Sequence, residues 1–106
     1  MESRTVLEGL LYDKATIDSI LDNFMVNTYM SKSGDKVVAD KITEMFNFYM
    51  SLGYTEDDVR RITKLHPQLL MFTSTGVMDK IKDIVSIGYT KEEVISLIHK
   101  YPALLL

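Results

Sequence analysis

The stretch SLGYTEDDVRRITKLHPQLL (residues 51–70) returns thirty-five positions later as SIGYTKEEVISLIHKYPALL (residues 86–105). In both copies an apolar segment ends in glycine, which is the usual residue just beyond a helix because it tolerates a left-handed backbone. A threonine follows two positions later, and an acidic residue comes three positions after it, which is the spacing of a helix capping box. The phrase therefore predicts one helix that ends at the glycine and a second that begins after the threonine.

The second half of the phrase predicts where that second helix stops. Apolar residues recur at helical spacing until Pro67 in the first copy and Pro102 in the second. Proline cannot continue a helix, but it suits the first turn of a new one, and a short apolar tail follows each proline. One unit therefore consists of a long helix, a Gly-Tyr-Thr turn, a second helix, a proline and a short third helix.

The repeats organise the whole chain. Clear repeats span residues 35–72 and 73–106, and a degenerate copy spans 10–34, where Tyr12 aligns with Tyr54 but the glycine and the proline are missing. A period near 35 residues is typical of helical solenoids, in which each unit covers the apolar face of its neighbour. The sequence predicts a single all-α domain over residues 1–106, a short α-solenoid of three-helix repeats.

Composition excludes several classes of protein. The chain has 106 residues, no cysteine and a formal net charge of −3, so it has no disulfide framework, no thiolate metal site and no overall attraction to nucleic acid. No apolar run approaches the ~18 residues of a membrane helix, and the N-terminus resembles neither a signal nor a transit peptide. We expect no membrane partner, and a location in the cytoplasm, or in an organelle matrix if a presequence has been removed.

The combination of period, Gly-Tyr-Thr turn and Pro-x-Leu-Leu resembles the repeat of the mitochondrial transcription termination factor (mTERF) family. The resemblance is good over residues 45–105 and weaker over 10–34. It implies a curved solenoid that cradles double-stranded nucleic acid and acts in transcription or a related step of gene expression. It therefore favours a small non-enzymatic nucleic-acid-binding module, with duplex DNA favoured over RNA as the partner.

The best candidates for phosphate contacts are Arg60, Arg61 and Lys64, because Arg60 and Lys64 share a helix face and arginine binds phosphate in a bidentate manner. The second copy lacks these charges, so the repeat itself does not require them. Lys80 and Lys82, together with Lys36 and Lys41, form a second basic set. If both sets lined one groove, about 4–6 phosphate contacts would make binding steeply salt dependent. The alternative interpretation is an ordinary solvated helix face.

No pattern indicates chemistry. The two histidines, His66 and His99, stand at non-equivalent repeat positions and lack the spacing of a zinc site. We find no nucleophile–base motif and no nucleotide-binding loop, and the acids near residue 57 suit a helix N-terminus. We therefore expect no catalytic residue, no metal, no cofactor and no small-molecule substrate.

The other open feature is the apolar C-terminal segment Leu104, Leu105 and Leu106. Solenoids normally finish with a polar capping repeat, so this segment predicts a protein partner, a homo-oligomer or a further stretch of chain. The alternative to nucleic-acid binding is therefore a protein–protein interaction module that uses this end.

Overall fold

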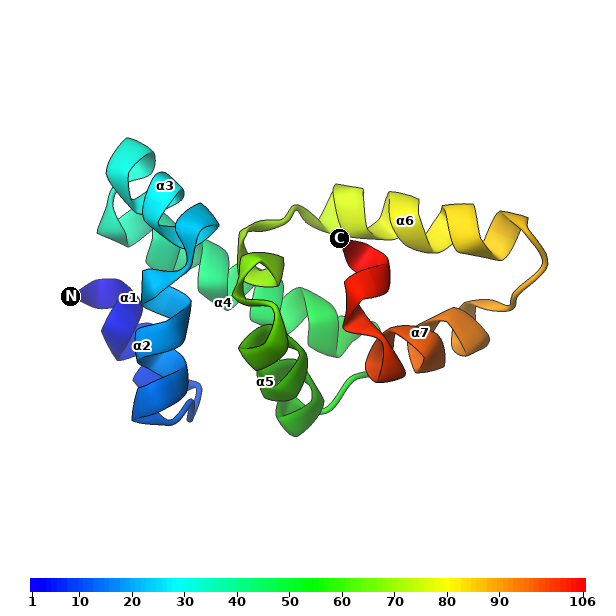
Figure 1. The fold of residues 1–106 in the computed structure, drawn as a ribbon, viewed down its shortest axis with the longest axis horizontal. Helices are drawn as coiled ribbons and strands as arrows, with labels where there is room; N and C mark the ends of the chain where they lie inside the picture. Colours follow the sequence, from blue (N-terminus) through cyan, green and yellow to red (C-terminus); the bar gives the residue numbers. More distant parts are fainter.

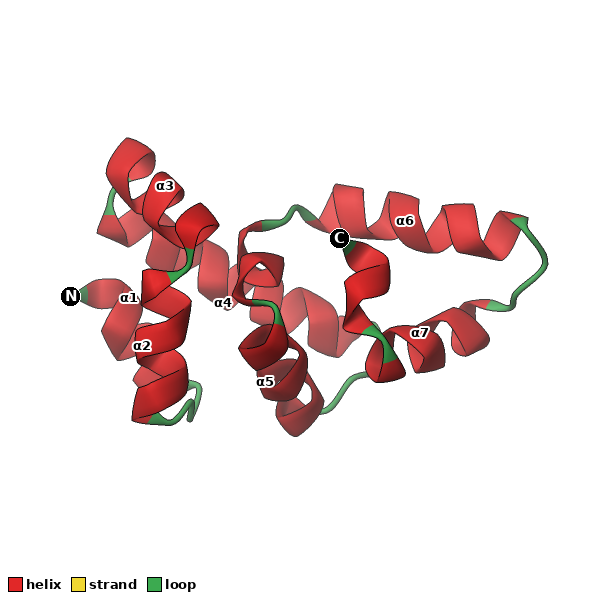
Figure 2. Cartoon of the chain, in the orientation of Figure 1, coloured by secondary structure: helices red, strands yellow, loops and turns green.

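The computed structural model describes all residues from 1 to 106 and contains helices and loops but no strand (Figures 1 and 2). The all-α prediction is confirmed. The elements, in chain order, are α1 (Glu2–Gly9), α2 (Lys14–Asp22), α3 (Phe24–Ser33), α4 (Asp35–Ser51), α5 (Glu56–Leu65), the 3-10 helix η1 (Pro67–Met71), α6 (Ser74–Ser86), α7 (Lys91–Lys100) and the 3-10 helix η2 (Pro102–Leu105).

The helices fall into three units of three. α1, α4 and α6 are the first helices of these units, α2, α5 and α7 the second, and α3, η1 and η2 the third. The molecule is elongated, 44 × 26 × 19 Å, with the α1–α3 unit at one end and the α6–α7 hairpin at the other (Figure 1). Because α1 packs along α4, and α2 along α5, the first two units stack side by side. Side chains of α5 and its preceding turn hydrogen-bond to α7 and so join the third unit to the second.

α1 is a helix that the sequence pattern did not predict. Its N-terminus is held by Asp35 at the start of α4. The carboxylate of Asp35 accepts hydrogen bonds from the Ser3 hydroxyl at 2.6 Å and from the main-chain N–H groups of Ser3 and Glu2. A residue thirty-two positions away supplies these bonds, so no local motif could have indicated them.

The repeated turn has the geometry that its residues require. Thr55 and Thr90 cap α5 and α7, and in both cases the full capping box forms with the acid three positions later. Gly53 and Gly88 have φ angles of 109° and 117°, where a side chain would be strained. Local sequence therefore fixes the two turns.

The third elements differ between the units. Pro67 and Pro102 begin the 3-10 helices η1 and η2, as the sequence predicts. In the N-terminal unit, where that proline is missing, the third element is the ten-residue α-helix α3, capped by Asn23.

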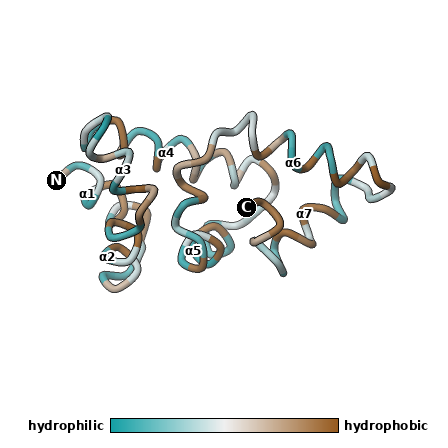
Figure 3. Tube along the Cα trace, turned by 45° about the horizontal axis from the view of Figure 1, so that its top comes forward, coloured by the Kyte–Doolittle hydropathy of each residue, from teal (hydrophilic) through white to brown (hydrophobic).

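The core is continuous through all three units, but the last one is thinly covered. Residues of α4, α5 and η1 form much of the core, and the hydroxyl group of Tyr49 donates a 2.7 Å hydrogen bond to the Leu69 carbonyl. In α6 only Val77 and Ile81 are buried. Exposed hydrophobic residues lie at the tip of the α6–α7 hairpin and along η2 (Figure 3). None of the helices combines the length and hydrophobicity needed to cross a bilayer.

Candidate nucleic-acid interface

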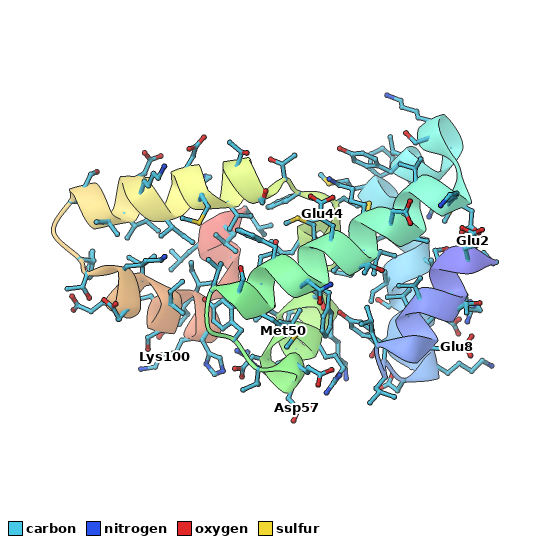
Figure 4. All side chains as sticks on the ribbon, turned by 180° about the vertical axis from the view of Figure 1, so that it is seen from behind. Glu2, Glu8, Glu44, Met50, Asp57 and Lys100 are labelled. Carbon is cyan, nitrogen blue, oxygen red and sulfur yellow. The ribbon has the colours of Figure 1, made fainter.

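Arg60 lies in the second turn of α5 and is only partly exposed. Its Nη1 atom donates a 2.9 Å hydrogen bond to the carbonyl oxygen of Leu10, the C-cap residue just after α1. Its Nη2 atom is 2.6 Å from a carboxylate oxygen of Asp57, and Glu56 lies 3.9 Å away. Figure 4 shows Asp57 at the outer end of α5. The charge of Arg60 is thus largely balanced by its own helix, and its guanidinium caps a helix of the preceding unit.

Arg61 contacts the following unit, whereas Arg60 contacts the preceding one. Its guanidinium donates a hydrogen bond to the carbonyl oxygen of His99, in the last turn of α7. The last carbonyls of a helix have no partner within the helix, so both arginines satisfy such orphan acceptors. No carboxylate lies within 4.0 Å of Arg61, so its charge stays unbalanced. Neighbouring arginines therefore tie the middle unit to the units on both sides.

The structure brings Arg60, Arg61 and Lys64 together in one hollow of about 340 Å³ between α2 and α5. Lys64 is exposed and has no carboxylate partner. Asp13 and Thr16 form the opposite wall, and the main-chain N–H of Thr16, which donates to the carboxylate, holds the pKa of Asp13 below its usual range. The hollow therefore contains three cationic groups and one ionised carboxylate.

The second basic set does not reach this hollow. Lys80 and Lys82 lie on α6, and Lys80 lines a different cavity, where its Nζ atom is 3.3 Å from the main-chain oxygen of Leu106. Lys82 is exposed and lines neither hollow. Lys80 and the three cationic residues of α5 therefore line different hollows.

The mTERF family model matches residues 13–106, and so covers the whole of α2 and everything after it. The chain belongs to the mTERF family. No curated protein and no solved structure gives a significant match. Family membership associates the chain with nucleic-acid binding in gene expression.

A polar cluster that the sequence did not reveal joins the second and third mTERF repeats. The Tyr54 hydroxyl donates a 2.7 Å hydrogen bond to the carbonyl oxygen of Ile95, and the Tyr54 ring stacks on His99 with centroids 6.5 Å apart. The Nε2 atom of His99 lies 2.8 Å from a carboxylate oxygen of Asp58. The repeated tyrosine of the Gly-Tyr-Thr turn is the only sequence signal at this cluster, and it does not identify the partners.

The C-terminal leucines of this mTERF chain are not equivalent. Leu105 is only 3% exposed and belongs to the core, whereas Leu104 and Leu106 are 41% and 48% exposed. A 3-10 helix turns about 120° per residue, so roughly one residue in three faces inward. Leu105 is therefore unavailable to a partner, which corrects the expectation that all three leucines form a contact surface.

No group of three or more histidine, aspartate or glutamate side chains gathers as a metal-binding cluster. His66 ends α5 as its C-cap residue, while His99 contacts Asp58 near the start of that helix.

Proposed function

We propose that this chain is a non-enzymatic nucleic-acid-binding module that contacts duplex DNA in transcription or a related step of gene expression. The mTERF family match over residues 13–106 is the observation that carries the proposal. The basic hollow between α2 and α5 supports it, because cations without carboxylate partners are the groups that phosphate oxygens bind.

The contacts of Arg60, Arg61 and Lys64 indicate that the three side chains have different roles. Lys64 is exposed and has no carboxylate within 4.0 Å, so its ammonium group can contact a phosphate. Arg61 uses one guanidinium nitrogen on the His99 carbonyl, and its other N–H groups stay available. Arg60 is balanced by Asp57 and acts mainly as a brace between units. Two phosphate contacts would give a slope of log K against log salt of roughly −2.

Fluorescence anisotropy of a labelled random-sequence DNA duplex, titrated at several salt concentrations, tests this proposal. We expect Lys64→Gln to weaken binding and to reduce the salt slope by about 1. Lys32→Gln is the matched control, because Lys32 is an exposed lysine of α3 far along the chain from the hollow. Equal loss in both variants, or no binding at low salt, would contradict the assignment of the hollow. Tighter binding to an RNA duplex of the same sequence would overturn the choice of DNA.

A second candidate is a protein-interaction module, because the Gly-Tyr-Thr turn of the last unit is exposed, whereas the same turn of the middle unit is covered by α7. Leu52 lines a hollow with Ile95 of α7, and Tyr54 bonds to the same residue, so α7 covers the turn of the middle unit. The equivalent residues Ile87 and Tyr89 are 74% and 43% exposed. Sedimentation equilibrium of the chain tests self-association through this turn. Concentration-dependent dimers that Ile87→Asp abolishes would support it, and a monomer at every concentration would contradict self-association.

A further inference from the structure

The turn between α1 and α2 has a feature that the two later turns lack. Leu11 has a φ angle of 65° and is the only residue other than glycine with a positive φ. Gly53 and Gly88 stand at the same position of the repeat, and all three main-chain N–H groups donate a 3.0 Å hydrogen bond to the carbonyl oxygen three residues earlier. The repeat therefore requires a positive φ at this position, which glycine adopts without strain and leucine does not.

The Leu11 side chain does not offset this strain within the fold. It is 72% exposed, and it belongs neither to the hydrophobic core nor to the partly buried residues packed against the core. Leucine is therefore a less stable choice than glycine at this position of the folded chain. A residue that strains the backbone without packing in the interior indicates a contact outside the chain.

The turn that carries Leu11 is fixed to α5 by the residues on both sides of it. The carbonyl oxygen of Leu10 accepts the 2.9 Å hydrogen bond from Arg60, and the hydroxyl group of Tyr12 lies 2.7 Å from that of Thr63. Tyr12 is itself buried. The exposed Leu11 side chain therefore projects from a backbone that is held in place.

The surroundings of Leu11 identify what it contacts. Leu11 lines the basic hollow between α2 and α5 together with Arg61 and Lys64, neither of which has a carboxylate within 4.0 Å. In a hollow of about 340 Å³, a phosphate group bound by these cations lies beside Leu11. The atoms next to a phosphate in a nucleic-acid strand belong to the sugar, and its C–H groups are apolar. An apolar side chain beside phosphate-binding cations therefore fits the sugar.

The sugar also carries the chemical difference between DNA and RNA. Ribose has a 2′-hydroxyl group where deoxyribose has only C–H, and a protein can use this group to distinguish the two. A hydroxyl group pressed against leucine loses water and gains no hydrogen bond, which is unfavourable. A leucine at the sugar therefore selects against RNA.

We propose that Leu11 contacts the deoxyribose next to a phosphate group bound by Arg61 and Lys64, and that this contact favours DNA over RNA. The inference rests on the proposed function and adds to it a residue that selects the type of nucleic acid.

Fluorescence anisotropy with labelled DNA and RNA duplexes of one sequence tests the proposal. We expect Leu11→Gly to bind the DNA duplex about fivefold more weakly, the size expected when part of a leucine side chain stays in water, and the RNA duplex with less than about a twofold change. Because the original chain and the variant bind the same two duplexes, the difference in helix shape cancels from this comparison. The salt slope should not change, because no charge is lost. The Tm of Leu11→Gly should rise by about 2–5 °C, because the backbone strain is removed.

Two further variants serve as controls. Leu11→Met keeps an apolar side chain at the strained position and should retain the preference for DNA. Val37→Ala shortens another exposed apolar side chain, on α4, that does not line the hollow, and it should change neither affinity.

Equal weakening of DNA and RNA binding by Leu11→Gly, or unchanged DNA binding, would overturn the inference. If Lys64→Gln weakened DNA binding while Leu11→Gly did not, the proposed function would stand and only the role of Leu11 would fall. No binding of the DNA duplex by the original chain at low salt would overturn both. A lower Tm for Leu11→Gly would show that the side chain packs within the fold and would also overturn the inference.

Discussion

The hydroxyl group of Tyr54 donates a hydrogen bond to the main-chain oxygen of Ile95, 41 residues away in the second helix of the next unit. Tyr12 stands at the same turn position one unit earlier, and its hydroxyl lies 2.7 Å from the hydroxyl oxygen of Thr63 in the next second helix. Tyr89, the third tyrosine of the series, is 43% exposed and makes no such bond. The turn tyrosine therefore links successive units by a hydrogen bond at two of its three positions, Tyr12 and Tyr54, but not at Tyr89.

Replacement of Tyr54 by phenylalanine tests this hydrogen bond between units. Loss of the hydroxyl leaves the Ile95 carbonyl without this donor, so we expect the free energy of unfolding to fall by about 1 kcal/mol. Tyr89→Phe is the matched control and should change it by less than about 0.5 kcal/mol, as expected of surface substitutions. Urea denaturation followed by circular dichroism measures both. Equal effects of the two substitutions would show that the hydrogen bond to Ile95 adds nothing.

Arg60 should contribute more to stability than to nucleic-acid binding. Arg60→Met keeps much of the apolar stem but removes the hydrogen bond to Leu10, so we expect a loss of about 1–2 kcal/mol of unfolding free energy. Lys64→Met, one turn later on α5, should change stability by less than about 0.5 kcal/mol, because that side chain is exposed. Thermal and urea unfolding measure the stability, and anisotropy measures binding to duplex DNA. An Arg60→Met variant of unchanged stability that no longer binds DNA would reverse the two roles.

Acid should weaken the N-terminal cap of α5 and, with it, the contact between α5 and α7. The main-chain N–H of Thr55, together with His99, holds the pKa of Asp58 below its usual value of 3.8. The unfolded state then takes up the proton more readily than the folded state as the pH falls. The contribution of the Asp58 carboxylate is therefore fully present above pH 3.8 and is lost as the pH falls below that value.

Urea unfolding at a series of pH values measures this loss. The stability difference between the original chain and Asp58→Asn should be present at neutral pH and should shrink as the pH falls below 3.8. Asp83→Asn is the control, because the Asp83 carboxylate on α6 makes no hydrogen bond or ion pair. A difference that does not vary with pH would show that the ionised carboxylate of Asp58 is not what stabilises the contact.

Two glycines should respond to alanine in opposite directions. Gly53 has a φ angle of 109°, so Gly53→Ala strains the turn and should cost about 1–3 kcal/mol. Gly9 ends α1 without a positive φ, and no atom lies within 4 Å of an added Cβ. Gly9→Ala should therefore raise stability by about 0.5–1 kcal/mol. Thermal unfolding measures the stability of both variants. Destabilisation by Gly9→Ala would show that an added methyl group is not accommodated at the end of α1.

The candidate site was only partly predictable from sequence. The pattern indicated Arg60, Arg61 and Lys64 as one cluster, and they do share one hollow. The carbonyl groups that the two arginines cap lie 50 and 38 residues away. No spacing rule connects side chains to acceptors at such distances, so their bracing role became visible only in the folded chain.

The sequence by itself determined the local elements of this protein. Each glycine turn, capping box and proline-started 3-10 helix depends on residues within a few positions of one another, and backbone sterics and local hydrogen bonds fix their geometry. The repeat of these signals also determined the all-helical stack.

Only the tertiary structure decided which surfaces remain open. Leu105 is buried while its neighbours Leu104 and Leu106 are exposed, Lys80 lines an apolar cavity rather than the basic hollow, and α1 is anchored by Asp35. Each of these outcomes depends on contacts between units that are distant in sequence. The physical reason is that burial and charge balance are properties of the packed assembly, whereas the pattern along one helix specifies only which face can be buried.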